Sequence, residues 1–289
     1  MPMIKYYTIL IVLLQIQKTF GGIFFCPVTS NCPHELLLLT SHKDSYAKFE
    51  EAICTAMSKA EAVHNANLVI NHYGTSGLYG TSGLFPLYNL LVYALENIVS
   101  PALDEETMWL EFGVNQGYSI NLTALVRDNK FAKESKQSKI GIYGFDWFRG
   151  LPTEWKSANL KRGYFDQMGV TPPVLPGVVL IPGLFNETLN SFLSEHHAVV
   201  SFVNIDNDLY EGALYILQRL IPRMRRNSVI HFHELLKWGE RGRCSGHDEL
   251  RALYEVFEVH PHLQLELLRY HGGILEPVIF RLIRKSGQD

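Results

Sequence analysis

Acidic and imidazole side chains end two apolar runs in the second half of the chain, and together they could carry out metal or acid–base chemistry. Asp206 ends the run at 199–206, and His233 and Glu234 directly follow the run at 228–232. The carboxyl ends of neighbouring parallel strands meet at one edge of a sheet, so these side chains are expected to converge. Carboxylates and an imidazole can hold a divalent metal, and without a metal Asp206 or His233 could act as a general base. Taken alone, Asp206 could instead cap the helix that follows.

A second set of residues fits the binding of a nucleoside. Glu111 is followed by Gly113 and Gly117, whose spacing allows a tight turn and a close approach of the backbone to a ligand. This spacing differs from the GxGxxG of a pyrophosphate-binding turn, and it suits a nucleoside with a charged amino-acid tail. A sharp strand-to-helix turn also needs glycine for purely structural reasons. Asp146 ends the run at 140–146, where a carboxylate can accept hydrogen bonds from two ribose hydroxyls.

The elements that would position these residues alternate along the chain from residue 108 to its end. The expected strands are 108–113, 140–146, 178–181, 199–206, 228–232, 263–269 and 277–283, and the expected helices are 118–128, 186–194, 210–225 and 247–257. This alternation predicts an α/β fold with a doubly wound, mainly parallel, seven-stranded, Rossmann-like sheet. The glycines at 272–273 predict a hairpin, so that the last strand is antiparallel to its neighbours.

The residues before this region predict a helical extension. Apolar positions recur every three or four residues over 42–67 and 86–99, which predicts two amphipathic helices. Between them, 73–85 contains GTSGL twice, a glycine- and serine-rich loop that could be a mobile lid or a duplication in a tolerant loop. We therefore predict three parts, 1–22, 23–107 and 108–289.

The N-terminal part is the basis for predicting the localisation of the protein. Its apolar run at 6–16 is shorter than the roughly 20 residues of a membrane span, and it suits a signal peptide or a short anchor. Alternatively, it is a buried first helix or strand of a cytoplasmic protein. Cys26 and Cys32 could pair in an oxidising compartment. The prediction is a protein of the secretory pathway or tethered to a membrane, with a cytoplasmic protein as the alternative.

Two glycosylation sequons begin at Asn121 and Asn186. Asn121 falls on the helix predicted at 118–128, which should pack against the sheet. A glycan would not fit there, so we expect the Asn121 sequon to be accidental.

The composition excludes several classes of protein. With 47% hydrophobic residues and a net charge of only -3, the chain is not disordered. The 26 basic and 29 acidic residues nearly balance, which leaves no general basic field for nucleic acid. Four cysteines without a CxxC pair are too few for a disulfide scaffold and do not indicate a structural zinc site.

Several strings in register resemble class I S-adenosylmethionine-dependent methyltransferases, and more narrowly the branch that includes the macrocin O-methyltransferases. They are WLEFGVNQGYSINLTA, YGFDWFRGLPTEW, PGLFNETL, VNIDNDLYEGALYIL and SVIHFHELLKWGE. The similarity extends over roughly residues 108–283, and the GFDxFxGLP pattern is specific to that branch.

The resemblance implies a role for each matching residue. Glu111, Gly113, Gly117 and Ser119 would surround the methionine part of the cofactor, Asp146 would hold its ribose, and Trp147 and Phe148 would lie near its adenine. Asp206 would be a metal ligand and candidate base, and Glu249 belongs to a further motif of undefined role. His233 and Glu234 fall where the branch usually has two acids.

His233 is the main departure from that pattern. Magnesium prefers oxygen ligands, so its binding should weaken, whereas manganese, iron or zinc tolerate an imidazole better. Alternatively, His233 is a general base in a site without metal. The cofactors implied are therefore S-adenosylmethionine and, as an open alternative, a divalent metal such as Mg or Mn.

The resemblance implies O-methylation of a small-molecule or glycan hydroxyl. Two other hypotheses stay open, a catalytically inactive binding module and a dehydrogenase, although the missing GxGxxG disfavours the latter. The loop at 147–176 would help to select the acceptor, and its Trp155, Tyr164 and Phe165 suit a partly apolar or sugar-stacking pocket. No nucleic-acid partner is expected, and a membrane tether through 6–16 and a homo-oligomer are compatible with the sequence.

Overall fold

The computed structural model of the chain describes most of the sheet region and short segments before it. The described residues are 38–40, 45–51, 53–54, 91, 94–95, 99, 106–131, 139–238, 244–246, 248–260, 262–270 and 276–284. All of them belong to one of two units of the chain, Leu36–Asp289. The predictions for 1–22, for the GTSGL repeat and for Cys26 and Cys32 lie outside the described residues.

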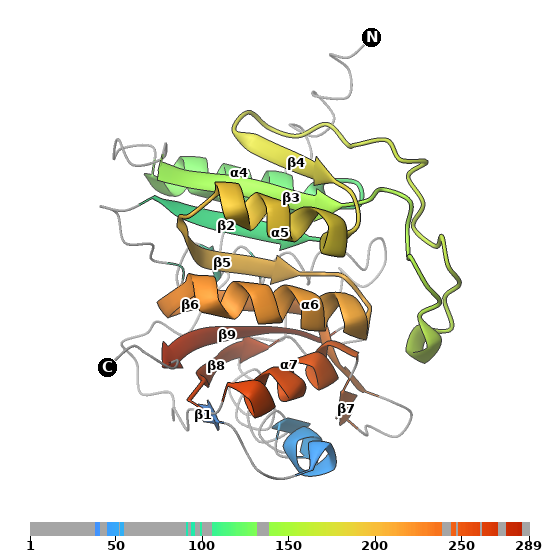
Figure 1. Cartoon of the computed structure of the whole chain (residues 1–289), viewed down its shortest axis with the longest axis vertical. Coiled ribbons are helices and arrows are strands. Elements are labelled where there is room, and N and C mark those ends of the chain that lie inside the picture. Colours follow the sequence, from blue (N-terminus) through green and yellow to red (C-terminus); the bar gives the residue numbers. More distant parts are fainter. Residues whose placement is uncertain are drawn as a thin grey trace, which may run out of the picture. The chain divides into compact units, whose positions relative to one another are not determined.

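The described strands form one mixed sheet (Figure 1). They are β1 (Leu38–Thr40), β2 (Thr107–Phe112), β3 (Ile140–Asp146), β4 (Val178–Pro182), β5 (Val199–Ile205), β6 (Met224–Trp238), β7 (Cys244–Gly246), β8 (Gln264–Tyr270) and β9 (Glu276–Arg284). Their order is β1-β8-β9-β6-β5-β2-β3-β4, with β7 paired to β6. From β4 to β6 the pairs are parallel, whereas β9 is antiparallel to both β6 and β8. The predicted fold and its antiparallel last strand are confirmed.

Helices cover both faces of this sheet. In Figure 1, α4 (Tyr118–Phe131) lies on one face, and α5 (Phe185–Glu195), α6 (Tyr210–Leu220) and α7 (Asp248–Val259) lie on the other. Alternation along β2 feeds the two cores: Leu110 and Phe112 belong to the core beneath α5 to α7, and Trp109 belongs to the core beneath α4. Both sides of the strands are therefore buried, as a doubly wound sheet requires.

Two elements differ most from their predicted bounds. The helix predicted over 210–225 ends at Leu220, because Pro222 supplies no N–H for another α-helical turn and the chain continues as a 3-10 turn, Ile221–Arg223. Strand β6 starts directly after it and is much longer than the predicted 228–232. The short strands β1 and β7 were not predicted.

Parts of the N-terminal extension pack on the sheet domain. Strand β1 pairs with β8, and the helical residues Phe49 and Ile53 are buried in the core beneath α5 to α7. Leu91 and Leu95, from the helix predicted at 86–99, are buried in the core beneath α4. Within the described residues, none of the helices has the length and apolarity needed to cross a membrane.

Gly113 sits where the turn after β2 meets the backbone after β5. Its φ is +93°, and a Cβ atom there would lie 1.8 Å from the Asp206 carbonyl oxygen. The Asp206 N–H also donates to the Phe112 carbonyl oxygen at 2.9 Å. Only glycine allows these two backbone segments to lie this close.

We expect Gly113→Ala to lower the free energy of unfolding by about 3 kcal/mol or more, through both backbone strain and steric overlap. Gly163 is a matched control, because its φ is +80° but nothing lies within 4 Å of a Cβ atom there. Gly163→Ala should cost only about 1–2 kcal/mol. Urea denaturation of both variants measures the difference, and equal losses would show that the close approach at Gly113 is not a constraint.

Candidate functional site

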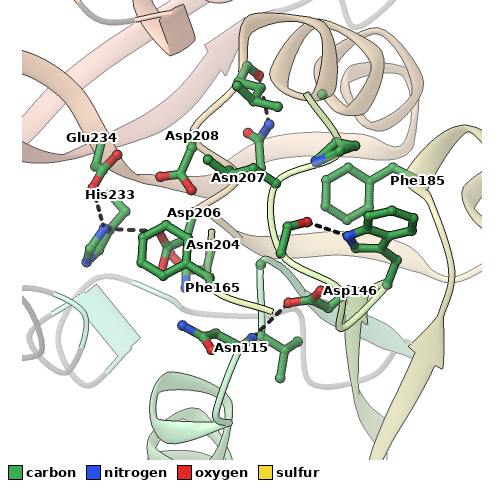
Figure 2. Close-up of a pocket in the computed structure, with 18 of the residues that line it drawn as sticks. Asn115, Asp146, Phe165, Phe185, Asn204, Asp206, Asn207, Asp208, His233 and Glu234 are labelled. Atoms are coloured by element: carbon green, nitrogen blue, oxygen red, sulfur yellow. Dashed lines mark hydrogen bonds and ion pairs between the residues drawn. The ribbon is translucent and has the colours of Figure 1, made fainter. Parts of the chain in front are cut away.

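A cavity of about 550 Å³ opens at the carboxyl edge of the parallel strands. Residues that follow β2, β3, β4 and β5, together with the middle of β6, line it (Figure 2). The predicted site residues that line it are Gly113, Ser119, Asp146, Trp147, Asp206, His233 and Glu234. Glu111 and Gly117 are not among the lining residues, and Phe148 is buried in the core beneath α4.

Asp146 is held at the end of β3 by two backbone N–H groups. Asn115 donates to its Oδ2 at 2.8 Å and Phe148 donates to its Oδ1 at 2.7 Å, as the dashed contact in Figure 2 shows for Asn115. Both donors belong to residues with positive φ, so the turns are shaped to present these N–H groups. Burial raises the pKa of Asp146, and the backbone hydrogen bonds partly oppose that rise. Each carboxylate oxygen keeps further acceptor capacity, which suits two neighbouring hydroxyls of a ligand.

Trp147 and Phe185 form the apolar wall near Asp146. The Trp147 indole N–H donates to the Gly150 carbonyl oxygen, so the ring is fixed against its own loop. Both side chains line the cavity. An aromatic wall next to a hydroxyl-binding carboxylate is suited to a nucleoside.

Glu111 is buried behind the cavity wall and accepts hydrogen bonds from two residues that line the cavity. Ser119 Oγ donates to its Oε1 at 2.7 Å, and Asn204 Nδ2 donates to its Oε2 at 3.1 Å. Burial raises the pKa of Glu111 to about 8 despite these hydrogen bonds. The role implied by the resemblance is thus changed: Glu111 positions two lining residues and does not itself line the cavity.

Asn204 and His231 are lining residues that the sequence reasoning missed. His231 Nδ1 lies 2.7 Å from Asn204 Oδ1, and burial lowers the pKa of His231 to about 3. Their signal in the sequence was a polar residue within each of the mainly apolar runs 199–206 and 228–232.

Asp206 and His233 form an ion pair beside a cluster of acids (Figure 2). His233 Nδ1 is 3.0 Å from Asp206 Oδ1 and 3.8 Å from Glu234 Oε1. Burial disfavours the charged ring, but the two carboxylates outweigh burial and hold the pKa of His233 well above its usual value. Glu249 on α7 accepts the Glu234 backbone N–H at 3.3 Å. Burial and the charge of Glu234 raise the pKa of both Glu249 and Asp208 well above the usual range.

The expected metal site is not supported by this arrangement. Among the described residues, no group of three or more His, Cys, Asp or Glu side chains could hold a metal ion. A ligating imidazole must be unprotonated, whereas the two carboxylates near His233 Nδ1 favour a proton on that ring. Asp206, His233 and Glu234 do converge as predicted, but they do so as an ion-paired cluster.

The loop between β3 and β4 contributes aromatic side chains unequally. Phe165 lines the cavity and contacts Tyr164 edge to face, with ring centroids 4.6 Å apart. Trp155 is buried instead against Leu151 and Leu209. Of the three aromatic residues predicted to shape the pocket, only Phe165 lines it.

Comparison with known proteins gives one family match and several similarities of fold. Residues 110–235 match a protein family described as a methyltransferase domain. A search of curated proteins found no match. The sequence match runs from β2 into β6 and so includes all five parallel strands.

The similar solved structures are distant in sequence. CalS11, described as a TDP-rhamnose 3'-O-methyltransferase of calicheamicin biosynthesis, is 24% identical with a TM-score of 0.47, over 86% of this chain and 98% of CalS11. The O-methyltransferase NovP is 14% identical with a TM-score of 0.45, over 69% of this chain and 80% of NovP. An O-methyltransferase from Bacillus cereus, in complex with SAH, is 15% identical with a TM-score of 0.43, over 84% of this chain and 92% of the other.

The buried Glu111 should make stability depend on pH. Between its ordinary pKa and about 8, the folded protein keeps a proton that the unfolded chain releases. The free energy of unfolding should therefore fall as the pH rises through this window, by up to about 1.4 kcal/mol per pH unit. Glu111→Gln should remove this part of the slope in urea denaturation between pH 5 and 9. The exposed Glu187→Gln is the control and should keep the wild-type profile. Identical profiles for wild type and Glu111→Gln would contradict the assignment.

Proposed function

We propose that the protein is an S-adenosylmethionine-dependent O-methyltransferase acting on a small-molecule or sugar hydroxyl, because residues 110–235 match a family described as a methyltransferase domain. The observation that carries the proposal is Asp146, which two backbone N–H groups fix at the cavity wall with acceptor capacity to spare. A carboxylate at this strand tip is well placed to accept two ribose hydroxyls.

The cavity also suits the remaining parts of the methyl donor. Trp147 and Phe185 offer an apolar wall for the adenine, and Ser119 lies at the start of α4, where helix N–H groups and the helix dipole favour a carboxylate. The volume of about 550 Å³ lies within the range of about 300–1,000 Å³ typical of small-molecule sites. At the outer wall, Phe165 could stack on an apolar acceptor or a sugar ring.

The acid cluster matches the charge of the donor. When bound, S-adenosylmethionine supplies an electrophilic methyl group on a positively charged sulfonium. Asp206, Asp208 and Glu234 line the cavity, while His233 is the cation paired with Asp206. Carboxylates around the cavity favour a cationic ligand over its neutral product.

The Asp206–His233 pair is the proposed base. As the acceptor oxygen forms its bond to the methyl carbon and the carbon–sulfur bond breaks, the hydroxyl proton passes to this pair. Because His233 is the cation of the pair and its Nδ1 lies 3.0 Å from Asp206 Oδ1, the Asp206 carboxylate is the group that receives the proton. General-base catalysis of this kind typically contributes about 10²–10⁴ in rate. The other wall residues align the reacting atoms and exclude water.

Binding of S-adenosylhomocysteine tests the proposal without knowledge of the acceptor. By calorimetry, the wild type should bind it, and Asp146→Asn should weaken binding about 10- to 100-fold, because hydrogen bonds to a charged group are lost. Asp206→Asn is the matched control in the same cavity and should change the affinity less than about threefold. Absence of binding to the wild type would favour an inactive binding module, and binding of NAD instead would favour a dehydrogenase.

We also propose that the protein enters the secretory pathway. Cys54 is disulfide-bonded, which is typical of oxidising compartments. The two sequons differ in accessibility. Asn121 is buried and hydrogen-bonded to the Pro173 carbonyl oxygen and the Leu175 N–H, whereas Asn186 is exposed in the first turn of α5. The membrane tether and the homo-oligomer remain predictions.

Expression of the full chain in a eukaryotic host tests whether the protein enters the secretory pathway. A single N-glycan should be attached at Asn186, seen as a mobility shift that a glycosidase removes. Thr188→Val should abolish the shift, because it destroys that sequon. Thr123→Val destroys the buried sequon and should leave the shift unchanged. A wild-type chain without any glycan would contradict the secretory route.

A further inference from the structure

A row of three polar side chains crosses the sheet beneath the cavity. Glu111 on β2 pairs in register with Asn204 on β5, and Asn204 pairs with His231 on β6. All three are at most 3% exposed and are linked by the hydrogen bonds described above. Two residues earlier, the same three strands place Trp109, Phe202 and Val229 in register, an entirely apolar row on the same face. Burying polar groups is costly, so the polar row calls for a reason beyond packing.

The hydrogen bonds of the row determine which nitrogen of His231 carries its hydrogen. Asn204 donates its amide N–H to Glu111 Oε2, so its amide oxygen faces His231. Because an amide oxygen can only accept, His231 Nδ1 must be the donor. The other nitrogen, Nε2, is buried and has no hydrogen-bond partner, so it presents a lone pair.

This lone pair belongs to a residue of the cavity wall. Ser119, Asn204 and His231 all line the cavity, and Glu111 joins them from below. A buried acceptor without a partner in such a wall is suited to a donor group of the bound ligand. The ribose hydroxyls of the methyl donor are assigned to Asp146 on β3, which β2 and β5 separate from β6. The charged hydrogen-bond donor on that ligand is its α-ammonium group.

We propose that His231 Nε2 accepts a hydrogen bond from the α-ammonium of the methyl donor, while the Ser119 backbone N–H at the start of α4 binds the neighbouring carboxylate. The assignment rests on the proposed function and extends it to a residue that selects the amino-acid end of the ligand. Two features favour the ammonium over a neutral hydroxyl of the acceptor molecule. A charged donor gains most from a buried acceptor, and Ser119, at the proposed carboxylate position, is hydrogen-bonded to Glu111 of the same row.

Two ligands separate this role from a structural one. S-adenosylhomocysteine carries the α-ammonium, and its deaminated analogue keeps the carboxylate and the nucleoside. His231→Leu should weaken the calorimetric affinity for S-adenosylhomocysteine about 10- to 100-fold and change the affinity for the analogue less than threefold. His231→Gln should keep the affinity for both ligands within about threefold, because its amide can donate to Asn204 and still offer an oxygen. Asp146→Asn should weaken the affinity for both ligands equally, since both contain the ribose.

The side-chain ¹⁵N resonances of the wild type provide a second measurement that does not depend on a variant that folds poorly. The Nε2 resonance of His231, assigned by its loss in His231→Gln, should be that of an unprotonated nitrogen. It should shift when S-adenosylhomocysteine is added, and the deaminated analogue should leave it in place.

Three results would overturn the assignment. If His231→Leu loses affinity equally for both ligands, the role of His231 is only structural. If its affinity for S-adenosylhomocysteine is unchanged, Nε2 does not contact the ammonium. A protonated Nε2 in the free protein would also overturn the assignment. If the wild type binds S-adenosylhomocysteine and any of these results is found, only this assignment fails. If the wild type does not bind it, the proposed function fails as well.

Discussion

The contact between the turn after β2 and the backbone after β5 is the constraint on which the site depends. At Gly113 the two segments lie so close that a single Cβ atom would overlap the Asp206 carbonyl oxygen. That approach places the tips of two neighbouring parallel strands against each other. It brings the turn that leads to Ser119 next to Asp206, and it brings the Asn115 N–H to Asp146 on the other side. On β6, which pairs with β5, His233 forms an ion pair with Asp206.

Polar groups are buried at this edge only where they have partners or face the cavity. Glu111 is satisfied by Ser119 and Asn204, and Asp146 is satisfied by backbone N–H groups. The acids near Asp206 are different, because a single imidazole faces several carboxylates, and burial and the charge of Glu234 raise the pKa of Asp208 and Glu249 well above the usual range. Such an arrangement costs stability and is typical of a functional site rather than of a core.

Much of this organisation could be predicted from the sequence. Strands buried on both faces appear as short apolar runs, and all seven predicted strands are present in the sheet. The strand-tip residues Asp146, Asp206, His233 and Glu234 were predicted because parallel strands end at a common edge, and all four line the cavity. The resemblance to methyltransferases agrees with the family match over residues 110–235.

What the sequence did not predict has local physical causes. Strands β1 and β7 span three residues each, too short for an apolar pattern. Asn204 and His231 lie at inward-facing strand positions, where the pattern alone indicates core packing. The metal site at Asp206, His233 and Glu234 was expected from residue types, but the imidazole faces the carboxylates directly. Orientation of side chains decides between a ligand set and an ion pair, and residue spacing does not contain that information.

The most direct test of the central claim is a crystal structure of the protein with S-adenosylhomocysteine bound. We predict that both ribose hydroxyls lie within hydrogen-bond distance of the Asp146 carboxylate and that the sulfur atom faces the Asp206–His233 pair. A ligand bound elsewhere, or one whose ribose does not contact Asp146, would contradict it.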